Sequence, residues 1–243
     1  MSRLSIVLPA YNEEGNIIPL TGEIMEALTG LLSHFDEIEC VFVDDASTDG
    51  TQREISEARA LYPALGIRLV ALKRNSGLSA AMAAGFAAAR GSVVATLDTD
   101  LQNDPRDLPK LLSHLDRGDV IIGIRANRRD TFIKRMSSKI ANWIRNRVTG
   151  EDIIDTGCSL KVYRKQHLDR IKLFTGLHRF LPTLLKLEGA RVIQVPVSHR
   201  PRIRGKAKYN FWNRLTGPLM DLLAVRWMQK RHFANQWEEI HGD

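Results

Sequence analysis

The first half of the chain alternates short apolar runs with longer segments of helical spacing. The apolar runs have the length and composition of buried strands, and strands are expected at Leu4–Leu8, Ile38–Val43, Ile67–Leu72, Ser92–Leu97 and Asp119–Ile124. Helices are expected between them, from Asn12 to about Leu32, after Gly50 to about Leu61, from Gly77 to Arg90, and from Pro105 to about Arg117. Strands joined in this way form right-handed crossovers, so the pattern predicts an α/β fold with a mainly parallel sheet flanked by helices.

The second half contains a basic amphipathic segment. Apolar residues recur there at helical spacing, with Arg and Lys between them, which predicts an amphipathic helix over about 131–148. Two placements stay open: the helix packs on the domain, or it lies on an anionic membrane, which Trp143 and the basic flank favour. Further strands are expected at Ser159–Tyr163 and Val192–Val197, and a helix at His178–Leu187. We expect one domain over 1–210, including the amphipathic helix, and an amphipathic helical tail over 211–243.

The positive charge is concentrated in two patches. The chain has a formal net charge of +7, while residues 125–147 hold eight bases and one acid, and residues 200–214 hold six bases and no acid. Nucleic acid, a phosphate-bearing substrate or an anionic membrane would each be attracted to such patches. No nucleic-acid-binding motif is recognisable, so nucleic acid is not an expected partner.

Composition also bears on the compartment. The chain is 44% hydrophobic and 26% charged, as expected of a globular protein. It has no apolar stretch of transmembrane length and no signal-peptide pattern. Its two cysteines, without metal-ligand spacing, indicate a reducing compartment. We therefore expect a peripheral protein without a transmembrane helix.

Acidic residues follow three of the expected strands. Asp98-Thr99-Asp100-Leu101-Gln102 closes one strand, Pro9-Ala10-Tyr11-Asn12-Glu13-Glu14 closes another, and Val43-Asp44-Asp45-Ala46-Ser47 closes a third. Open α/β sheets bind ligands at this edge, and carboxylate and amide oxygens suit a hard divalent cation that holds a diphosphate. Neither a Gly-x-Gly-x-x-Gly motif after the first strand nor a P-loop motif occurs. The arrangement predicts a nucleotide-diphosphate site rather than a dinucleotide or P-loop site.

These motifs resemble the family 2 glycosyltransferases of GT-A fold. The similarity narrows to the polyprenyl-phosphate branch, which includes dolichol-phosphate mannose synthases, and it covers roughly residues 3–230. The motifs that carry it are Asn75-Ser76-Gly77, the run from Asp98 to Pro105, His199-Arg200-Pro201-Arg202, and Gly205-Lys206-Ala207-Lys208-Tyr209. Thr99 stands where a smaller residue is frequent in this family, and Ala207 stands where Ser is common.

The resemblance implies a UDP- or GDP-sugar donor, Mg²⁺ or Mn²⁺, and a polyprenyl-phosphate acceptor of cell-envelope biosynthesis. The residues it implies for the nucleotide sugar are Pro9, Tyr11, Glu13, Asp44, Asp45, Asp98, Thr99, Arg125 and Lys208. Those implied for the metal are Asp98, Asp100 and Gln102. Asp100, Arg202 and Asp155 are the candidate catalytic residues, with Arg125, Arg202 and Lys208 on phosphate groups. Many bacterial members carry C-terminal transmembrane helices, which this sequence lacks, so we expect it on the cytoplasmic face of the membrane.

The expected reaction is a single displacement with inversion at the anomeric carbon. A phosphate nucleophile is already anionic near neutral pH and needs no strong base, so Asp155 orients a substrate or caps a turn; with a hydroxyl acceptor it would be the base. Asp44 either contacts the donor or orients a turn. His178 and His199 either contact a substrate or have a surface or packing role. Two alternative functions stay open: transfer to a soluble or polysaccharide acceptor, and a non-catalytic nucleotide- or nucleic-acid-binding module. A homo-oligomer is also left open.

Overall fold

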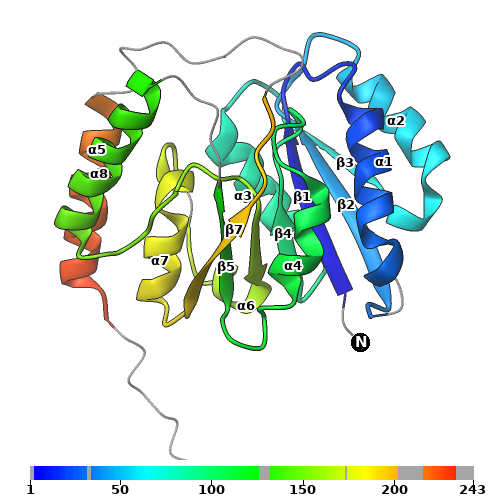
Figure 1. The fold of residues 1–243 in the computed structure, drawn as a ribbon. Helices are drawn as coiled ribbons and strands as arrows, with labels where there is room; N and C mark the ends of the chain where they lie inside the picture. Colours follow the sequence, from blue (N-terminus) through cyan, green and yellow to red (C-terminus); the bar gives the residue numbers. More distant parts are fainter. Residues whose placement is uncertain (1–2, 32–33, 126–131, 173, 202–215, 234–243) are drawn as a thin grey trace, which may run out of the picture.

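A seven-stranded sheet forms the centre of the molecule (Figure 1). The computed structural model describes residues 3–31, 34–125, 132–172, 174–201 and 216–233. The strand order is β3-β2-β1-β4-β6-β5-β7. The strands are β1 (Arg3–Ala10), β2 (Glu37–Asp44), β3 (Arg68–Ala71), β4 (Val93–Thr96), β5 (Val120–Arg125), β6 (Lys161–Arg164) and β7 (Val192–Val197).

All adjacent strands run parallel except at β6. β6 lies antiparallel between β4 and β5, with Val162 opposite both Ala95 and Ile121. The prediction of a mainly parallel sheet flanked by helices is thus confirmed. Because β6 is reversed, its beginning lies at the edge where β1, β2 and β4 end, and it brings the preceding loop to that edge.

Helices cover both faces of the sheet (Figure 1). On one face, α1 (Ile17–Leu28), α2 (Thr51–Leu61) and α4 (Leu108–Leu112) share a core with the sheet. On the other face, α3 (Leu78–Ala88), α6 (Lys165–Leu168) and α7 (Leu181–Leu187) do the same. The Ala-rich α3 lies very close to β1: a Cβ on Gly85 would come within 2.3 Å of a Val7 methyl carbon, so only glycine fits there. The short 3₁₀ helices are η1 (Thr29–Leu31), η2 (Pro63–Leu65), η3 (Pro105–Asp107) and η4 (Leu177–Phe180).

Several expected helix limits were wrong. Asn12 does not start a helix, because its φ is +51°; α1 begins at Ile17 instead. The helix expected from Pro105 to Arg117 is the 3₁₀ turn η3 followed by α4, which ends at Leu112. Proline favours the first turn of a helix but does not set the helix length.

A pair of long helices, α5 (Phe132–Thr149) and α8 (Thr216–Arg231), lies side by side at one end of the sheet (Figure 1). α8 buries Leu222 and Val225 against Phe180, the last residue of η4, and Leu184, in the middle of α7. The expected amphipathic helix at 131–148 is therefore present as α5, and the expected tail includes α8. The boundary expected at residue 210 lies outside the described residues. Within the described part of the chain, no helix is long and apolar enough to cross a membrane.

Candidate active site

Three loops meet at the edge of the sheet where β1, β2 and β4 end. Each holds one non-glycine residue of left-handed backbone: Asn12 (φ 51°), Ala46 (φ 58°) and Leu101 (φ 61°). In the described part of the chain these are all the non-glycine residues with positive φ. Such a backbone is costly for a residue with a side chain and is found preferentially at functional sites. The local strain of this protein is thus concentrated at the edge that the sequence motifs single out.

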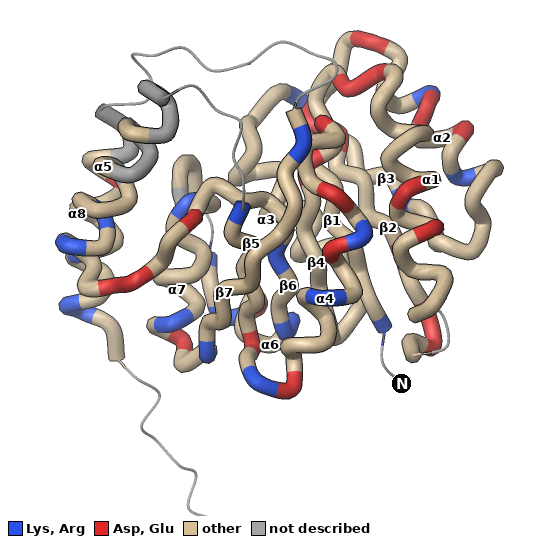
Figure 2. Tube along the Cα trace, viewed as in Figure 1, with Lys and Arg blue, Asp and Glu red and all other residues tan. Residues whose placement is uncertain are grey.

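The loops after β1 and β2 are joined by direct hydrogen bonds. The Asn12 N–H donates to Ser47 Oγ (2.9 Å), and Asn12 Oδ1 accepts from the Thr48 N–H (2.8 Å). The Glu13 N–H donates to Thr51 Oγ1 (2.8 Å), at the start of α2. These bonds fix the two loops relative to each other. Acidic residues of these loops gather above α1 and α2 in Figure 2.

Asp45 organises a third segment of the same edge. Its two carboxylate oxygens accept from the N–H groups of Ser76 (2.7 Å) and Gly77 (2.8 Å), and its own N–H donates to the Ala10 carbonyl (2.9 Å). The Asn75-Ser76-Gly77 motif is therefore held against β1 and β2. Half-buried Pro9 and Tyr11 lie in the neighbouring strand end and loop.

Asp44 has a different environment from Asp45. It has no exposed surface, and its carboxylate accepts from the Ser47 N–H (3.2 Å) and from Gln52 Nε2 (2.6 Å). Of its two roles weighed from sequence, these contacts favour orientation of the turn over contact with a donor.

Asp98 and Asp100 follow β4 in a largely buried setting. Between them, Thr99 is 2% exposed and its hydroxyl donates to the Pro9 carbonyl (3.0 Å), which ties the acidic motif to β1. Burial, and then the charge of Asp100, raise the pKa of Asp98 to about 6. Ser159 and the charges of Lys161 and Arg125 act in the opposite direction. A bound cation would offset the repulsion between these two buried carboxylates.

The donor set fits a divalent metal ion. Asp98 and Asp100 supply carboxylates, and Gln102 supplies an amide while its N–H donates to Asp100 Oδ1 (3.2 Å). Oxygen ligands of this kind would suit Mg²⁺ or Mn²⁺. No group of three or more His, Cys, Asp or Glu side chains able to hold a metal is found among the described residues.

Asp98→Asn is expected to stabilise the metal-free protein at pH 8. The raised pKa means that ionising Asp98 costs more in the folded than in the unfolded chain, so its contribution to stability falls as pH rises from about 4 to about 6. The free energy of unfolding of the variant should exceed that of the wild type by about 1–2 kcal/mol at pH 8, and the difference should vanish near pH 4. Urea unfolding with EDTA at both pH values measures it. A difference independent of pH would contradict the assignment, and added Mn²⁺ should stabilise only the wild type.

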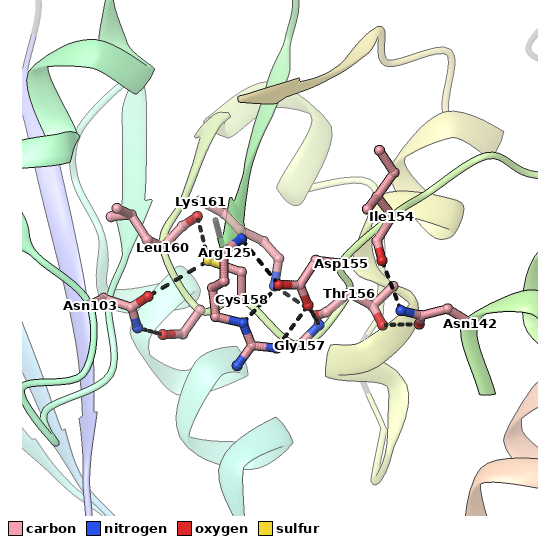
Figure 3. A network of polar contacts seen from close by, with 11 residues as sticks. Asn103, Arg125, Asn142, Ile154, Asp155, Thr156, Gly157, Cys158, Leu160 and Lys161 are labelled. Carbon is pink, nitrogen blue, oxygen red and sulfur yellow. Dashed lines mark hydrogen bonds and ion pairs between the residues drawn. The ribbon is translucent and has the colours of Figure 1, made fainter. Parts of the chain in front are cut away.

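The loop before β6 brings a second charged cluster to this edge (Figure 3). Arg125, at the end of β5, forms a two-pronged ion pair with Asp155: Nε to Oδ2 is 2.7 Å and Nη2 to Oδ1 is 2.8 Å. The Gly157 N–H also donates to Oδ1 (3.1 Å). Lys161, 4% exposed, donates to the Thr156 carbonyl (3.4 Å). Asp155 thus holds Arg125 in place, and this pairing is unfavourable for a role as general base.

Arg200 joins the segment after β7 to the acidic motif, a contact that the sequence did not indicate. Its guanidinium pairs with Glu23 of α1 (2.8 Å) and with Asp104 (2.6 Å), and its N–H donates to the Gln102 carbonyl (2.7 Å). The sequence places Arg200 in a basic patch and in the motif from His199 to Arg202, but nothing near Glu23 in the sequence signals a partner 177 positions away. Arg200 fixes the backbone of Gln102 and so supports the acidic motif.

Four further residues were predicted for this site: Arg202, Lys208, His178 and His199. Arg202 and Lys208 lie outside the described residues. His178 Nδ1 is 2.7 Å from Ser79 Oγ, and burial lowers the pKa of His178 to about 3, which keeps it neutral. His199 pairs with Asn103 in an isolated antiparallel bridge. Both contacts agree with a packing role, and substrate contact by either histidine stays a prediction.

The mainly parallel sheet, with an acid pair and an Asp-organised loop at its carboxyl edge, has the architecture of a GT-A glycosyltransferase. The chain belongs to glycosyl transferase family 2, whose family model matches residues 5–172. The family resemblance inferred from sequence is confirmed, and the protein is an enzyme of this type.

The chain is similar in sequence to one characterised protein and in fold to two solved structures described below. The dodecaprenyl-phosphate galacturonate synthase of Rhizobium johnstonii is 38% identical over 234 residues, which are 93% of this chain and 67% of that protein. The glucosyl-3-phosphoglycerate synthase of Mycobacterium tuberculosis, solved with Mn²⁺, UDP and phosphoglyceric acid, is 19% identical, with a TM-score of 0.67 over 94% of this chain and 78% of its own. The mannosyltransferase PcManGT of Pyrobaculum calidifontis, solved with GDP-Man and Mn²⁺, is 20% identical. Its TM-score is 0.67, and the match covers 96% of this chain and 65% of PcManGT. The two structures share the fold, and the first relative belongs to the polyprenyl-phosphate branch.

Proposed function

We propose that this enzyme transfers a sugar from a nucleotide-diphosphate sugar to a polyprenyl phosphate such as undecaprenyl phosphate, with inversion and with Mg²⁺ or Mn²⁺. The observation that carries the proposal is the acid pair Asp98 and Asp100, held beside the Asp45-organised loop at the strand ends. The named activity of the relative from Rhizobium johnstonii supports a lipid-phosphate acceptor. The donor nucleotide is UDP or GDP.

The donor occupies the β1, β2 and β4 side of the edge. Pro9, Tyr11, Glu13 and Asp45 contact the nucleoside there, while Asp98, Asp100 and Gln102 hold the metal. When bound, the metal offsets the negative charge that grows on the departing nucleoside diphosphate. Thr99 keeps the acid motif against β1. A diphosphate held by that motif would lie next to the nucleoside loops.

The acceptor approaches from the β5 and β6 side. A phosphate oxygen of the acceptor attacks the anomeric carbon, a new C–O bond forms, and the bond to the nucleoside diphosphate breaks on the opposite face. The acceptor oxygen carries its charge before attack, so no proton has to be removed. Arg125 orients the acceptor phosphate, because the two-pronged ion pair with Asp155 fixes its guanidinium at this edge. Arg202 and Lys208 are proposed as further phosphate contacts.

The lipid acceptor requires contact with a membrane, and the α5–α8 pair is suited to it. The described exposed apolar residues of this face are Met136, Ile140, Trp143, Ile144, Leu219, Met220, Leu223 and Trp227. Arg147, Arg226, Lys230 and Arg231 are exposed on the same two helices, and basic residues follow α8 in Figure 2. Apolar and basic residues together favour the surface of an anionic bilayer. We propose that the enzyme binds the cytoplasmic face of the membrane in this way.

The double variant Trp143→Glu and Trp227→Glu is expected to bind anionic vesicles roughly tenfold more weakly. Both side chains are more than 60% exposed, at 67% and 63%, so the substitutions leave the core intact. Flotation with phosphatidylglycerol-containing vesicles measures the effect. Leu61→Glu on α2, where the leucine is 59% exposed, is the matched control and should bind as wild type. Equal flotation of all three proteins, or a change from dimer to monomer in light scattering, would assign the face to protein contact instead.

A donor panel tests the reaction itself. Purified protein is incubated with UDP- and GDP-sugars, undecaprenyl phosphate and Mn²⁺ or Mg²⁺, and the lipid product is detected by mass spectrometry. A glycosylated lipid phosphate from at least one donor is the expected result. Transfer only to a soluble or polysaccharide acceptor would overturn the acceptor assignment. Nucleotide binding without transfer to any acceptor would indicate a non-catalytic module.

A further inference from the structure

Helix α5 has two chemically different sides. Ile140, Trp143 and Ile144 are 40–67% exposed on its outer side. Asn142, Arg145 and Asn146 make hydrogen bonds to the loop that follows the helix. These three polar residues stand at spacings of three and four, which places them on one side of a helix. The helix therefore joins an exposed apolar surface to an internal polar contact.

The contacted loop, 151–157, is held at two successive peptide groups. The Ile153 carbonyl accepts from Arg145 Nη2 (2.9 Å) and from Asn146 Nδ2 (3.0 Å). The Ile154 carbonyl accepts from Asn142 Nδ2 (2.8 Å), and Asn142 Oδ1 accepts from the Thr156 hydroxyl (3.4 Å). Asn142 thus contacts the loop on both sides of Asp155, the residue that binds Arg125.

The opposite side of this loop is fixed by β7. Gln194 Oε1 accepts from the Ile154 N–H (2.7 Å), and Gln194 Nε2 donates to the Asp152 carbonyl (3.2 Å). The Ile154 peptide is therefore clamped between α5 and the sheet. Asn142, the loop, Asp155 and Arg125 form one continuous series of polar contacts from α5 to the active edge (Figure 3).

Arg145 shows that this contact has an electrostatic component. Arg145 is 6% exposed, and among the described residues its Nε and Nη1 have no hydrogen-bond partner. Burial lowers the pKa of Arg145, while the charges of Glu151 and Asp155 act against this. A buried guanidinium with free donors is costly, and neutral side chains would suffice merely to fasten a helix to a loop. The positive charge of Arg145 has a purpose if it helps to hold the Asp155 carboxylate in position.

We propose that Asn142 is a positioning residue that couples the placement of α5 to the Arg125–Asp155 pair. This inference rests on the proposed function, because Arg125 acts there on the acceptor phosphate. The donor residues are held by β1, β2 and β4 through contacts that do not involve α5. Loss of Asn142 therefore affects the acceptor side and spares the donor side. When the outer side of α5 binds a lipid surface, the placement of α5 is transmitted through Asn142 and the loop 151–157 to Asp155 and Arg125.

Asn142→Ala tests the inference, with Gln229→Ala as matched control. Gln229 Nε2 donates to the Thr149 carbonyl at the far end of α5 (3.0 Å), so the control also removes one side-chain bond to a backbone carbonyl, away from Asp155. For Asn142→Ala we expect kcat/KM for the lipid phosphate to fall roughly tenfold. The dissociation constant of the nucleotide with Mn²⁺, measured by calorimetry, should stay as in wild type. Gln229→Ala should match the wild type in both measurements.

A second readout separates positioning from stability. The wild type should transfer sugar faster on anionic vesicles than in neutral detergent. Asn142→Ala should float with vesicles as well as the wild type does, but its transfer rate should be the same on vesicles and in detergent. An Asn142→Ala protein that is less stable but has unchanged kinetic constants would overturn the inference, as would equal loss in Gln229→Ala. Absence of transfer by the wild type itself would instead contradict the proposed function.

Discussion

Asp100→Asn is expected to abolish transfer while leaving the protein folded, with a loss of roughly 10³-fold in kcat. Asp100 is 8% exposed and accepts a hydrogen bond from the Gln102 N–H, which an Asn side-chain oxygen can still accept. The substitution therefore keeps the backbone of the motif and removes one negative charge from the proposed metal site. Less metal is then bound, and the charge on the departing diphosphate is not offset.

The measurement combines a transfer assay over a range of Mn²⁺ concentrations with calorimetry of nucleotide binding. The variant should need much more Mn²⁺ and bind nucleotide less tightly with the metal, with little difference in EDTA. Asp116→Asn is the control, because Asp116 is an exposed acid at the opposite edge of the sheet, before β5. Full activity of Asp100→Asn in low Mn²⁺ would contradict a role for this carboxylate in metal binding.

The edge that carries the acid motif was predictable because its signals are local. An apolar run marks a buried strand, and the acids that follow it must lie at the carboxyl end of that strand. The same argument placed the motifs after β1, β2 and β4 together, and these three strands are neighbours in the sheet. Pattern and position alone were sufficient to predict that these three motifs meet at one edge of the sheet.

The second half of the site depends on features without a local signal. β6 enters the sheet antiparallel between β4 and β5, although it follows α5 in sequence. Its direction is set by packing with both neighbours, and this determines that Asp155 and Ser159 reach the active edge. The Arg125–Asp155 pair spans 30 positions, and each residue alone is an ordinary charged residue at a strand or loop.

The start of α1 shows a limit of capping rules. Asn is a favoured N-cap, so Asn12 was a reasonable start for the helix. Asn also tolerates a left-handed backbone better than most residues, and that property is the one used at φ +51°. The helix starts later because residues 12–15 are bonded instead to the loop after β2 and to the first turn of α2.

Arg125→Met is expected to reduce both activity and stability. Removing the guanidinium takes away the ion-pair partner of the buried Asp155 carboxylate, which is 4% exposed. This should lower the free energy of unfolding by about 3 kcal/mol. Transfer should fall roughly 10²-fold in kcat/KM for the lipid phosphate, because the oriented phosphate contact is lost. Nucleotide binding should change little, since the donor side is built on β1, β2 and β4.

The double variant Arg125→Met with Asp155→Asn separates the two effects. Asn removes the buried charge and still accepts from the Gly157 N–H, so most of the lost stability should return. Activity should not return, because the phosphate contact needs the guanidinium. Thermal unfolding and acceptor kinetics of the single and double variants measure both quantities. Recovery of activity together with stability would show that Arg125 supports the fold alone, and the acceptor phosphate would then have to be oriented by other residues.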